Sequence, residues 1–467
     1  MDQIIEKLVS VKPSERQLSW QEMEFTAFFH YGINSFTDRE WGNGQESISQ
    51  FYPKDLNTDQ WCESIKAAGI KGCIITAKHH DGFCLWNTAY TNHSVMYTPL
   101  KRDIVAELAA SCQRYRIKLG VYLSPWDRHE ATYGQGKIYD DYFCNQLTEL
   151  MTNYGELYTV WFDGACGEGS NGKKQEYDWN RYYQLIRKLQ PNAVISVSGP
   201  DVRWCGNEAG DCRPSEWSVV PAAAFSQSEI AKVSQQSDDT EFRSRKIDVM
   251  DLDLGSRDAL RDIEELIWYP AEVDTSIRPG WFYHKSEDDK VKSLEELQRI
   301  YINSVGGNTV LLLNIPPHKD GYITHYDRER LQELGKFIRE SFSNNLIGQA
   351  SLKASSTEQP FDVTNLNDNS ESYWKAEDYC DYCNISVELK DNHLIRYIVL
   401  SEQITCSQRV EMFTIDAEID GAMCTVYNGT TIGYKKICPI HPVITKRIVI
   451  NFIQFRKSPV LKSLCLC

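Results

Sequence analysis

Polar residues that could bind a small hydroxylated ring follow three short apolar runs of the chain. They are Asp163, His30 and the adjacent pair His79 and His80, and a glycine follows each of them within three positions. An unpaired carboxylate is costly to bury, so Asp163 must lie at an open strand end, hydrogen-bonded and in a cleft. Neutral histidines both donate and accept hydrogen bonds, which suits vicinal hydroxyl groups on a ring.

Each of these residues also has a structural explanation. Asp163 could orient a neighbouring arginine, and a lone histidine is more often a satisfied core residue. Successive side chains of a strand point to opposite faces, so His79 and His80 reach one ligand only where the chain has begun to turn. Because His30 also ends an apolar run, a shared binding cluster is the better interpretation.

An α/β barrel is the fold that brings several strand ends to one site. From about residue 20 to 345, apolar segments alternate with amphipathic ones, as in repeated βα units around a parallel sheet. The predicted strands are 25–31, 71–78, 117–123, 156–162, 192–198, 267–273 and 308–315, and the predicted helices are 58–69, 101–116, 139–154, 178–190, 291–304 and 326–342. No glycine-rich phosphate loop follows the first strand, so we predict a (β/α)8-like barrel with one hidden or degenerate strand rather than an open doubly wound sheet.

A chain of 467 residues exceeds what one hydrophobic core usually supports, so two domains are expected. The barrel would occupy residues 1–345, and an all-β sandwich would occupy residues 346–467. There, segments such as 385–389 alternate in polarity like half-exposed antiparallel strands. Residues 363–374 resemble the opening of discoidin-like sandwich modules, many of which bind carbohydrate. Residues 236–264, rich in both signs of charge, predict a solvated loop or a surface helix.

The composition is that of an ordinary globular protein, and the net charge favours a neutral partner. Hydrophobic residues make up 42% and charged residues 25%, and no apolar run reaches the roughly 18 residues that span a bilayer. The formal net charge of -15 repels nucleic-acid phosphates, so no nucleic acid is expected as a partner. Several of the 12 tryptophans lie beside the polar strand ends, which suits stacking on a sugar face, although aromatic-rich cores are the commoner cause.

The 15 cysteines are interpreted mostly as free thiols. Cys73 and Cys112, for example, lie within apolar or helical segments, where a thiol fills space. Cys380-Asp-Tyr-Cys383 lacks the second pair that a structural zinc site needs. The first residues show no basic segment followed by an apolar one, so no export signal is visible.

Four motifs in combination resemble the catalytic domain of glycoside hydrolase family 29, the α-L-fucosidases. They are His30-Tyr-Gly, Lys78-His-His-Asp-Gly-Phe-Cys-Leu-Trp86, Leu119-Gly-Val-Tyr-Leu-Ser and Trp161-Phe-Asp-Gly. The resemblance implies a retaining hydrolysis in which Asp163 attacks the anomeric carbon and forms a fucosyl-enzyme ester. It also implies that the following residues bind the sugar: His30, Glu40, Trp41, His79, His80 and Tyr122.

The second carboxylate of the reaction is one of Asp201, Glu208 and Glu216, because its sequence position varies within the family. Residues 201–220 resemble the subgroup that cleaves α-1,3 and α-1,4 fucosyl linkages in branched, Lewis-type glycans, where the acid corresponds to Glu208. Glu208 lies in a loop with glycine and asparagine and could reach over the cleft, whereas Glu216 looks more like a supporting residue. We expect hydrogen-bond donors to hold Asp163 as an anion, and burial to raise the pKa of Glu208.

Two tryptophans could cover the sugar, Trp126 in Ser-Pro-Trp-Asp and Trp281 in Arg-Pro-Gly-Trp-Phe-Tyr-His. Fucose carries a C6 methyl group and an apolar ring face, so stacking on indole favours it over sugars with a C6 hydroxyl. Core packing explains each tryptophan equally well.

The resemblance predicts fucosylated oligosaccharides or glycoconjugates as partners. No cofactor is required, because substrate, water and two carboxylates suffice. A structural calcium ion in the C-terminal domain would fit the discoidin resemblance, although the Asn/Asp-rich stretch 365–369 is equally a plain turn. Enzymes that degrade glycans usually meet them outside the cytosol, so a periplasmic or secreted location is expected, whereas the unpaired cysteines favour a cytoplasmic one.

Two other functions could use the same residues. A metal-dependent barrel hydrolase could bind a catalytic metal through His30, His79, His80 and Asp163. Adjacent histidines at a strand end bind one metal awkwardly, and the first predicted strand has no His-x-His spacing, so we predict no metal site. A noncatalytic carbohydrate-binding protein on a retired hydrolase barrel is disfavoured because both carboxylates are present.

Overall fold

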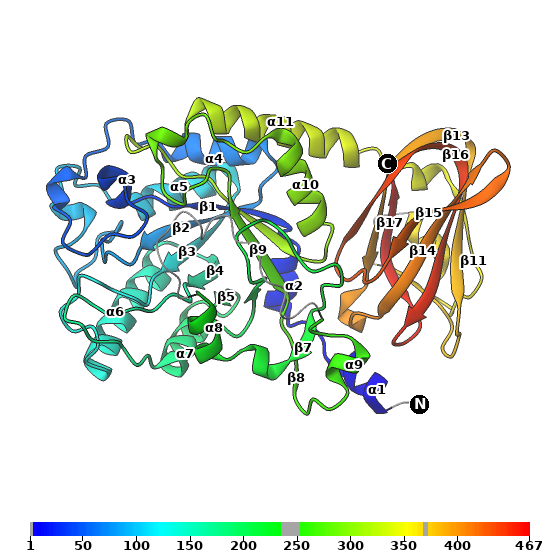
Figure 1. Cartoon of the computed structure of the whole chain (residues 1–467), viewed down its shortest axis with the longest axis horizontal. Coiled ribbons are helices and arrows are strands. Elements are labelled where there is room, and N and C mark those ends of the chain that lie inside the picture. Colours follow the sequence, from blue (N-terminus) through cyan, green and yellow to red (C-terminus); the bar gives the residue numbers. More distant parts are fainter. Residues whose placement is uncertain (1–2, 235–252, 368–371) are drawn as a thin grey trace.

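The computed structural model describes residues 3–234, 253–367 and 372–467, and Figure 1 shows them as two parts that lie side by side. The longer part contains a parallel sheet surrounded by helices, and the C-terminal part is an antiparallel sheet. These are the α/β and all-β architectures that the sequence predicts.

Eight parallel strands form a nearly closed barrel in the order β5-β4-β3-β2-β1-β10-β9-β6. Their bounds are β1 (Phe25–Phe29), β2 (Gly72–Lys78), β3 (Lys118–Leu123), β4 (Leu157–Phe162), β5 (Val194–Val197), β6 (Arg203–Trp204), β9 (Ala271–Ser276) and β10 (Val310–Asn314). The two strands at the ends of this order, β5 and β6, meet at a parallel bridge between Ser196 and Val202. The prediction of an eight-stranded barrel is confirmed.

The strand that the sequence hides is β6, which has only 2 residues and therefore no periodicity to detect. The prediction of one strand over 267–273 is wrong, because the chain breaks there at Pro270. Before the break, β8 (Leu266–Trp268) pairs antiparallel with β7 (Val219–Pro221), and after it the barrel strand β9 begins. Proline has no N–H group for a sheet ladder, which accounts for the break.

The six predicted helices are present as α4 (Thr58–Ala67), α5 (Ile104–Tyr115), α6 (Lys137–Asn153), α7 (Trp179–Leu189), α10 (Leu294–Ser304) and α11 (His325–Phe342). Most of them start after a polar residue whose side chain accepts a backbone N–H, namely Asn57, Asp103, Asp178, Ser293 and Thr324. Shorter helices are α1 (Gln3–Ser10), α2 (Glu15–Gln21), α3 (Asn34–Thr37), α8 (Gln227–Ser234) and α9 (Arg257–Leu260). In the charged segment 236–264, residues 236–252 lie outside the described residues, and α9 belongs to the remainder.

Side chains of the barrel strands alternate between two apolar cores. The inner core includes Phe28, Ile74, Tyr122, Trp161 and Leu312. Their chain neighbours, for example Phe29 and Ile75, belong to the larger core beneath the helices. Because successive side chains point to opposite faces, His30 and Asp163 continue the inward series of Phe28 and Trp161. The strands thus deliver these polar groups to the mouth of the barrel.

The C-terminal sheet consists of β11 (Ser351–Ala354), β12 (Trp374–Lys375), β13 (Cys383–Glu402), β14 (Val410–Ile419), β15 (Ala422–Gly429), β16 (Lys436–Phe455) and β17 (Val460–Leu466). The long strand β13 pairs with β16 throughout, but its first half also pairs with β11 and its second half with β17. Register shifts between Glu388 and Tyr397 separate the two halves, and such irregularities let one strand pass from one layer to another. The strands enclose a second core that includes Trp374, Phe413 and Phe452.

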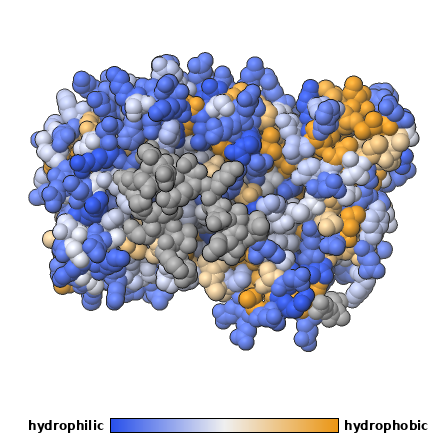
Figure 2. Space-filling model, viewed as in Figure 1, coloured by the Kyte–Doolittle hydropathy of each residue, from blue (hydrophilic) through white to orange (hydrophobic). Residues whose placement is uncertain are grey.

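Some expectations concern features outside the barrel. The calcium prediction concerns the stretch 365–369. Residues 368 and 369 lie outside the described residues, and the Asn365 amide donates to the Tyr373 carbonyl at 2.9 Å. The calcium site therefore stays a prediction. No helix in the described ranges is both long and apolar enough to cross a membrane. All 15 cysteines are free thiols. Figure 2 shows a mostly hydrophilic face, on which apolar residues gather over the C-terminal part.

Candidate active site

A cavity opens at the carboxyl ends of the barrel strands. Its lining residues are Phe28, His30, Glu40, Trp41, His79, His80, Trp161, Asp163, Gly164, Ala165, Val197, Trp204, Glu208, Asp274 and Trp281. Eight residues that the sequence analysis singled out are among them: His30, Glu40, Trp41, His79, His80, Asp163, Glu208 and Trp281. The two others, Tyr122 and Trp126, do not line the cavity but contact residues that do.

Asp163 follows β4 directly, and its side chain is 23% exposed. The backbone N–H of Ala165 donates to its Oδ1 at 2.8 Å, and the Tyr122 hydroxyl donates to its Oδ2 at 3.0 Å. Burial raises the pKa of Asp163, and these hydrogen bonds oppose that rise because they stabilise the anion. Tyr122 therefore acts on the carboxylate and does not itself reach the cavity.

Hydrogen bonding fixes the proton of His80 on one ring nitrogen. The Ser124 hydroxyl donates to the Trp126 carbonyl at 2.6 Å, which leaves its oxygen to accept from His80 Nδ1 at 2.7 Å. Burial lowers the pKa of His80 to about 3, so the ring is neutral near pH 7 and Nε2 is an acceptor. His80 Nε2 lies 3.7 Å from Asp163 Oδ2, and a hydroxyl group placed between them could donate to either.

His30 and His79 are also neutral. The Asn314 amide nitrogen donates to the Trp281 carbonyl at 2.8 Å, so the Asn314 oxygen accepts from His30 Nδ1 at 2.9 Å and leaves Nε2 as an acceptor. Burial lowers the pKa of His30 to about 4 and that of His79 well below its usual value. His79 Nδ1 is buried and has no hydrogen-bond partner. These rings can therefore bind hydroxyl groups but do not supply positive charge.

Glu40 is held in the cavity wall by groups from the segment after β9. The backbone N–H groups of Trp281 and Phe282 donate to its two oxygens at 2.9 and 3.3 Å, and His284 Nε2 lies 2.6 Å from Oε1. Burial opposes protonation of His284, but hydrogen bonds to Glu40 and Asp38 raise its pKa to about 9. The sequence analysis missed His284, because it does not end an apolar run. In the structure it also lies outside the cavity lining.

The two predicted sugar-stacking tryptophans differ in position. The Trp281 ring lines the cavity and lies 5.0 Å from the His30 ring. Trp126 is only 5% exposed, and its indole N–H donates to the Glu168 carbonyl at 3.0 Å. Its ring packs edge-on against Trp41 at 5.5 Å. Trp126 thus lies behind the cavity wall, and its contact with a bound sugar stays a prediction.

Of the three acids considered for the second carboxylate, Glu208 is the one that lines the cavity. Glu216 forms a buried ion pair with Arg203. Asp201 pairs with Arg187 at 2.5 Å and accepts a backbone N–H. These two acids thus pair with arginines and do not line the cavity.

Glu208 lies in the loop after β6, and its Oε2 accepts the Trp281 indole N–H at 3.1 Å. Burial raises its pKa well above the usual value, and the negative charges of Asp274, Asp163 and Glu40 raise it further. This direction agrees with the expectation from the sequence.

Asp274 is a fourth carboxylate in the cavity, beside Glu40, Asp163 and Glu208, and the sequence analysis missed it. It is 4% exposed on β9 and accepts the Trp204 indole N–H at 2.8 Å. Burial raises its pKa to about 7. Two residues earlier on the same strand, Glu272 accepts the Trp161 indole N–H at 2.7 Å. The alternation of Glu272 and Asp274 with apolar neighbours was the available signal, because it marks an inward-facing pair on a buried strand.

In the described ranges, no three His, Cys, Asp or Glu side chains are grouped so that they could hold a metal ion. The histidines at the strand ends instead have hydrogen-bond partners or apolar neighbours, such as the Phe282 ring 5.0 Å from His79.

Comparison with known proteins decides the family. The family model described as Alpha-L-fucosidase matches residues 6–341. The chain belongs to the α-L-fucosidase family. It is 39% identical over 447 residues to "Alpha-L-fucosidase 1" of Arabidopsis thaliana, a match that covers 93% of this chain and 83% of the relative.

Solved structures of this family share the whole fold. A glycoside hydrolase 29 family member from an unknown rumen bacterium is 36% identical, with a TM-score of 0.80 over 98% of this chain and 77% of that one. A Ruminococcus gnavus GH29 fucosidase in complex with fucose is 28% identical, with a TM-score of 0.83 over 98% of this chain and 94% of that one. The fucosidase family membership predicted from the four motifs is thus confirmed, and the chain is a glycoside hydrolase.

Proposed function

We propose that the chain releases terminal α-L-fucose by double displacement, with Asp163 as nucleophile and Glu208 as general acid and base. The observation that carries this proposal is the contrast between two carboxyl groups in one cavity. Asp163 accepts hydrogen bonds from Ala165 and Tyr122, which favour its anion, whereas burial and the nearby carboxylates raise the pKa of Glu208 well above its usual value. A retaining glycosidase needs one ionised and one protonated carboxyl group.

In the first step, an Asp163 carboxylate oxygen attacks the anomeric carbon of fucose. The bond between this carbon and the glycosidic oxygen breaks, and Glu208 gives its proton to the departing oxygen. The product is a fucosyl ester of Asp163 with inverted configuration. In the second step, Glu208 takes a proton from water, the water oxygen attacks the same carbon, and the ester bond breaks. The second inversion restores the original configuration.

The neutral histidines fit the recognition of a sugar. His30 and His80 each keep an Nε2 acceptor, and fucose presents hydroxyl donors around its ring. Trp281 offers an indole face to the C6 methyl group and the apolar ring face. The proposed substrates are fucosylated oligosaccharides or glycoconjugates, and the reaction needs no cofactor.

A preference for α-1,3 and α-1,4 linkages in Lewis-type glycans is supported by the segment around Glu208. Glu208 lines the cavity, as the subgroup resemblance of residues 201–220 requires. We also propose a periplasmic or secreted location from the nature of these substrates.

The roles of the two carboxylates can be separated by azide rescue. We expect Asp163→Gly to lower kcat/KM on every fucoside by about 10⁴-fold or more, because the nucleophile is lost. We expect Glu208→Ala to lower kcat/KM for fucosyl oligosaccharides by about 10²- to 10⁴-fold, but to change it little for 2,4-dinitrophenyl fucoside, whose leaving group needs no proton. With azide, the Asp163 variant should form β-fucosyl azide after one inversion, and the Glu208 variant α-fucosyl azide after two.

NMR of the azide products is the measurement. Asp274→Asn is the matched control, because it removes a carboxylate from the same cavity. If Asp274→Asn, and not Glu208→Ala, shows the selective loss and yields the α-azide, the acid has been assigned to the wrong residue.

The electrostatic influence of neighbours on Glu208 predicts two opposite pH effects. The alkaline limb of kcat/KM reports deprotonation of the acid in the free enzyme. Asp274→Asn removes a negative charge that raises the pKa of Glu208, so this limb should move to lower pH. Trp281→Phe removes a hydrogen bond that stabilises the Glu208 anion, so the limb should move to higher pH. Shifts in the same direction would contradict this electrostatic assignment.

The linkage preference predicts the order of natural substrates. Fucose release from Lewis-type trisaccharides should be faster than release from a 2-linked fucosyl lactose at equal concentration. Chromatographic measurement of released fucose tests this, with an aryl fucoside as reference for the intrinsic activity. Faster cleavage of the 2-linked compound would overturn the linkage proposal and leave the fucosidase activity intact.

A further inference from the structure

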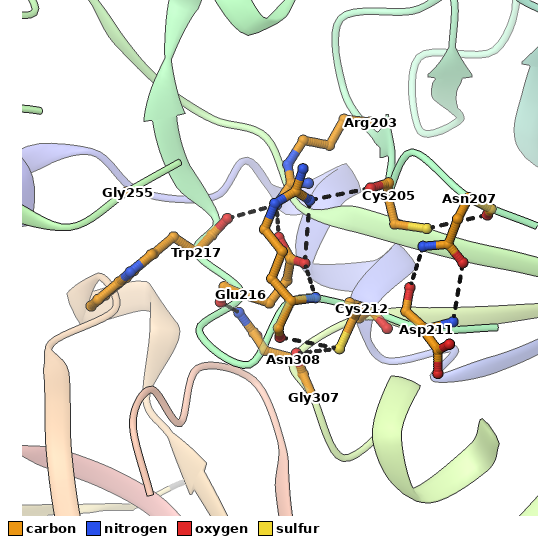
Figure 3. A network of polar contacts seen from close by, with 12 residues as sticks. Arg203, Cys205, Asn207, Asp211, Cys212, Glu216, Trp217, Gly255, Gly307 and Asn308 are labelled. Atoms are coloured by element: carbon orange, nitrogen blue, oxygen red, sulfur yellow. Dashed lines mark hydrogen bonds and ion pairs between the residues drawn. The ribbon is translucent and has the colours of Figure 1, made fainter. Parts of the chain in front are cut away.

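The loop that carries Glu208 comprises residues 205–218, between β6 and β7, and we call it the Glu208 loop. Its two limbs are tied together by charged side chains. Arg203, at the base of the first limb, forms an ion pair with Glu216 on the second limb. Arg213 donates from its guanidinium to the carbonyl of residue 205 at 3.2 Å, and its backbone N–H donates to Glu216 at 3.0 Å. Figure 3 shows this network around the Arg203 guanidinium.

The tip of the Glu208 loop is also fixed. The Asn207 side chain accepts the backbone N–H of Ala209 at 3.0 Å and donates to the Asp211 carbonyl at 2.7 Å. Ala209 forms an antiparallel bridge with Thr275 on β9. Glu208 therefore lies between two residues whose positions are set by hydrogen bonds.

The C-terminal part of the chain holds the second limb of this loop. Gln408, which precedes β14, is fully buried. Its side-chain oxygen accepts the Ser218 N–H at 2.9 Å, and its side-chain nitrogen donates to the Glu216 carbonyl at 3.1 Å. The Thr430 hydroxyl, after β15, donates to the Pro214 carbonyl at 2.9 Å.

Asn308, which precedes the barrel strand β10, also contacts both the Glu208 loop and the C-terminal part. Its amide nitrogen donates to the Glu216 carbonyl at 2.9 Å, and its amide oxygen accepts the backbone N–H of Tyr434 at 2.7 Å. Its own backbone N–H donates to the Lys435 carbonyl at 3.0 Å. The backbone of Glu216 is thus the point where the barrel, the Glu208 loop and the C-terminal sheet meet.

We propose that Gln408 is a positioning residue for Glu208, and that the C-terminal domain thereby forms part of the catalytic machinery. Gln408 fixes the backbone of Glu216 and Ser218, the Arg203 and Arg213 contacts transmit that position to the first limb, and Asn207 sets the tip. The inference rests on the proposed role of Glu208 as the acid. Proton transfer needs heavy atoms within hydrogen-bond reach, and a displacement of about 1 Å can cost on the order of 10²-fold in rate.

The test is Gln408→Leu, which removes both hydrogen bonds and keeps a side chain of similar size. We expect kcat/KM for a fucosyl oligosaccharide to fall by about 10- to 100-fold through misplacement of the acid. For 2,4-dinitrophenyl fucoside, kcat/KM should change by less than about threefold, because no proton is needed for departure of the leaving group. A purely structural role would lower both values by the same factor.

Asn451→Leu is the matched control. Asn451 is 8% exposed in the C-terminal sheet, and its side chain bonds to Thr414 and Asp416 on β14 and to Tyr382, which immediately precedes β13. The variant therefore loses a buried amide from the same domain without touching the Glu208 loop. It should show no difference between the two substrates.

A double variant tests whether the effect of Gln408→Leu depends on Glu208. If Gln408 acts through Glu208, then adding Gln408→Leu to Glu208→Ala should lower oligosaccharide hydrolysis no further. Multiplied losses, or equal losses on both substrates for Gln408→Leu alone, would overturn the inference and leave the acid assignment standing. Loss of the acid assignment itself would instead be seen in Glu208→Ala alone, as an absence of substrate selectivity. If Gln408→Leu does not fold, Thr430→Val is the alternative, because it removes only the bond to Pro214. It should lower kcat/KM for the oligosaccharide by a smaller factor and leave kcat/KM for the aryl fucoside unchanged. A ratio of the two values equal to that of the parent enzyme would overturn the inference.

Discussion

Four carboxyl groups share one aromatic-lined cavity, and the repulsion among three of them, Asp163, Glu208 and Asp274, is the constraint on which the site depends. Asp163 raises the pKa of both Glu208 and Asp274, Asp274 raises that of Glu208, and burial makes each anion more costly than in water. Asp163 accepts hydrogen bonds from Ala165 and Tyr122, whereas Glu208 accepts one indole N–H and its pKa is raised by burial and by the nearby carboxylates. The proposed mechanism therefore places the negative charge on Asp163 and the proton on Glu208.

The histidines do not reduce this difference between the two carboxyl groups, because they carry no positive charge. His30 and His80 have lowered pKa values of about 4 and 3, so neither can neutralise Asp163 near pH 7. The protein provides a cation elsewhere, at His284, which bonds to Glu40 in the cavity wall. A neutral, hydroxylated ligand suits such a cavity, since it can donate to the imidazole acceptors without adding charge beside the carboxylates.

Much of the fold and of the site could be predicted from the sequence. Five of the six predicted helices begin after a polar cap residue, and Asp163 and the histidines end apolar runs of the kind that form barrel strands. The features that could not be predicted depend on contacts between residues far apart in the sequence. The strand β6 has 2 residues and exists through its pairing with β9. The packing of Trp126 against Trp41 joins residues that are far apart in the chain. The contacts of Gln408 join residues about 190 positions apart, and no local pattern reveals them.

The central claim is that Asp163 becomes covalently bonded to the sugar, and mechanism-based trapping tests it most directly. In a 2-deoxy-2-fluoro-fucosyl fluoride, the 2-fluorine destabilises the positively charged transition states of both steps, and the good leaving group at C1 speeds only the first, so the ester forms faster than water removes it. The protein is then digested, and mass spectrometry locates the modified residue. We predict a fluorofucosyl adduct on Asp163. An adduct on Glu208, Asp274 or another residue would contradict the mechanism.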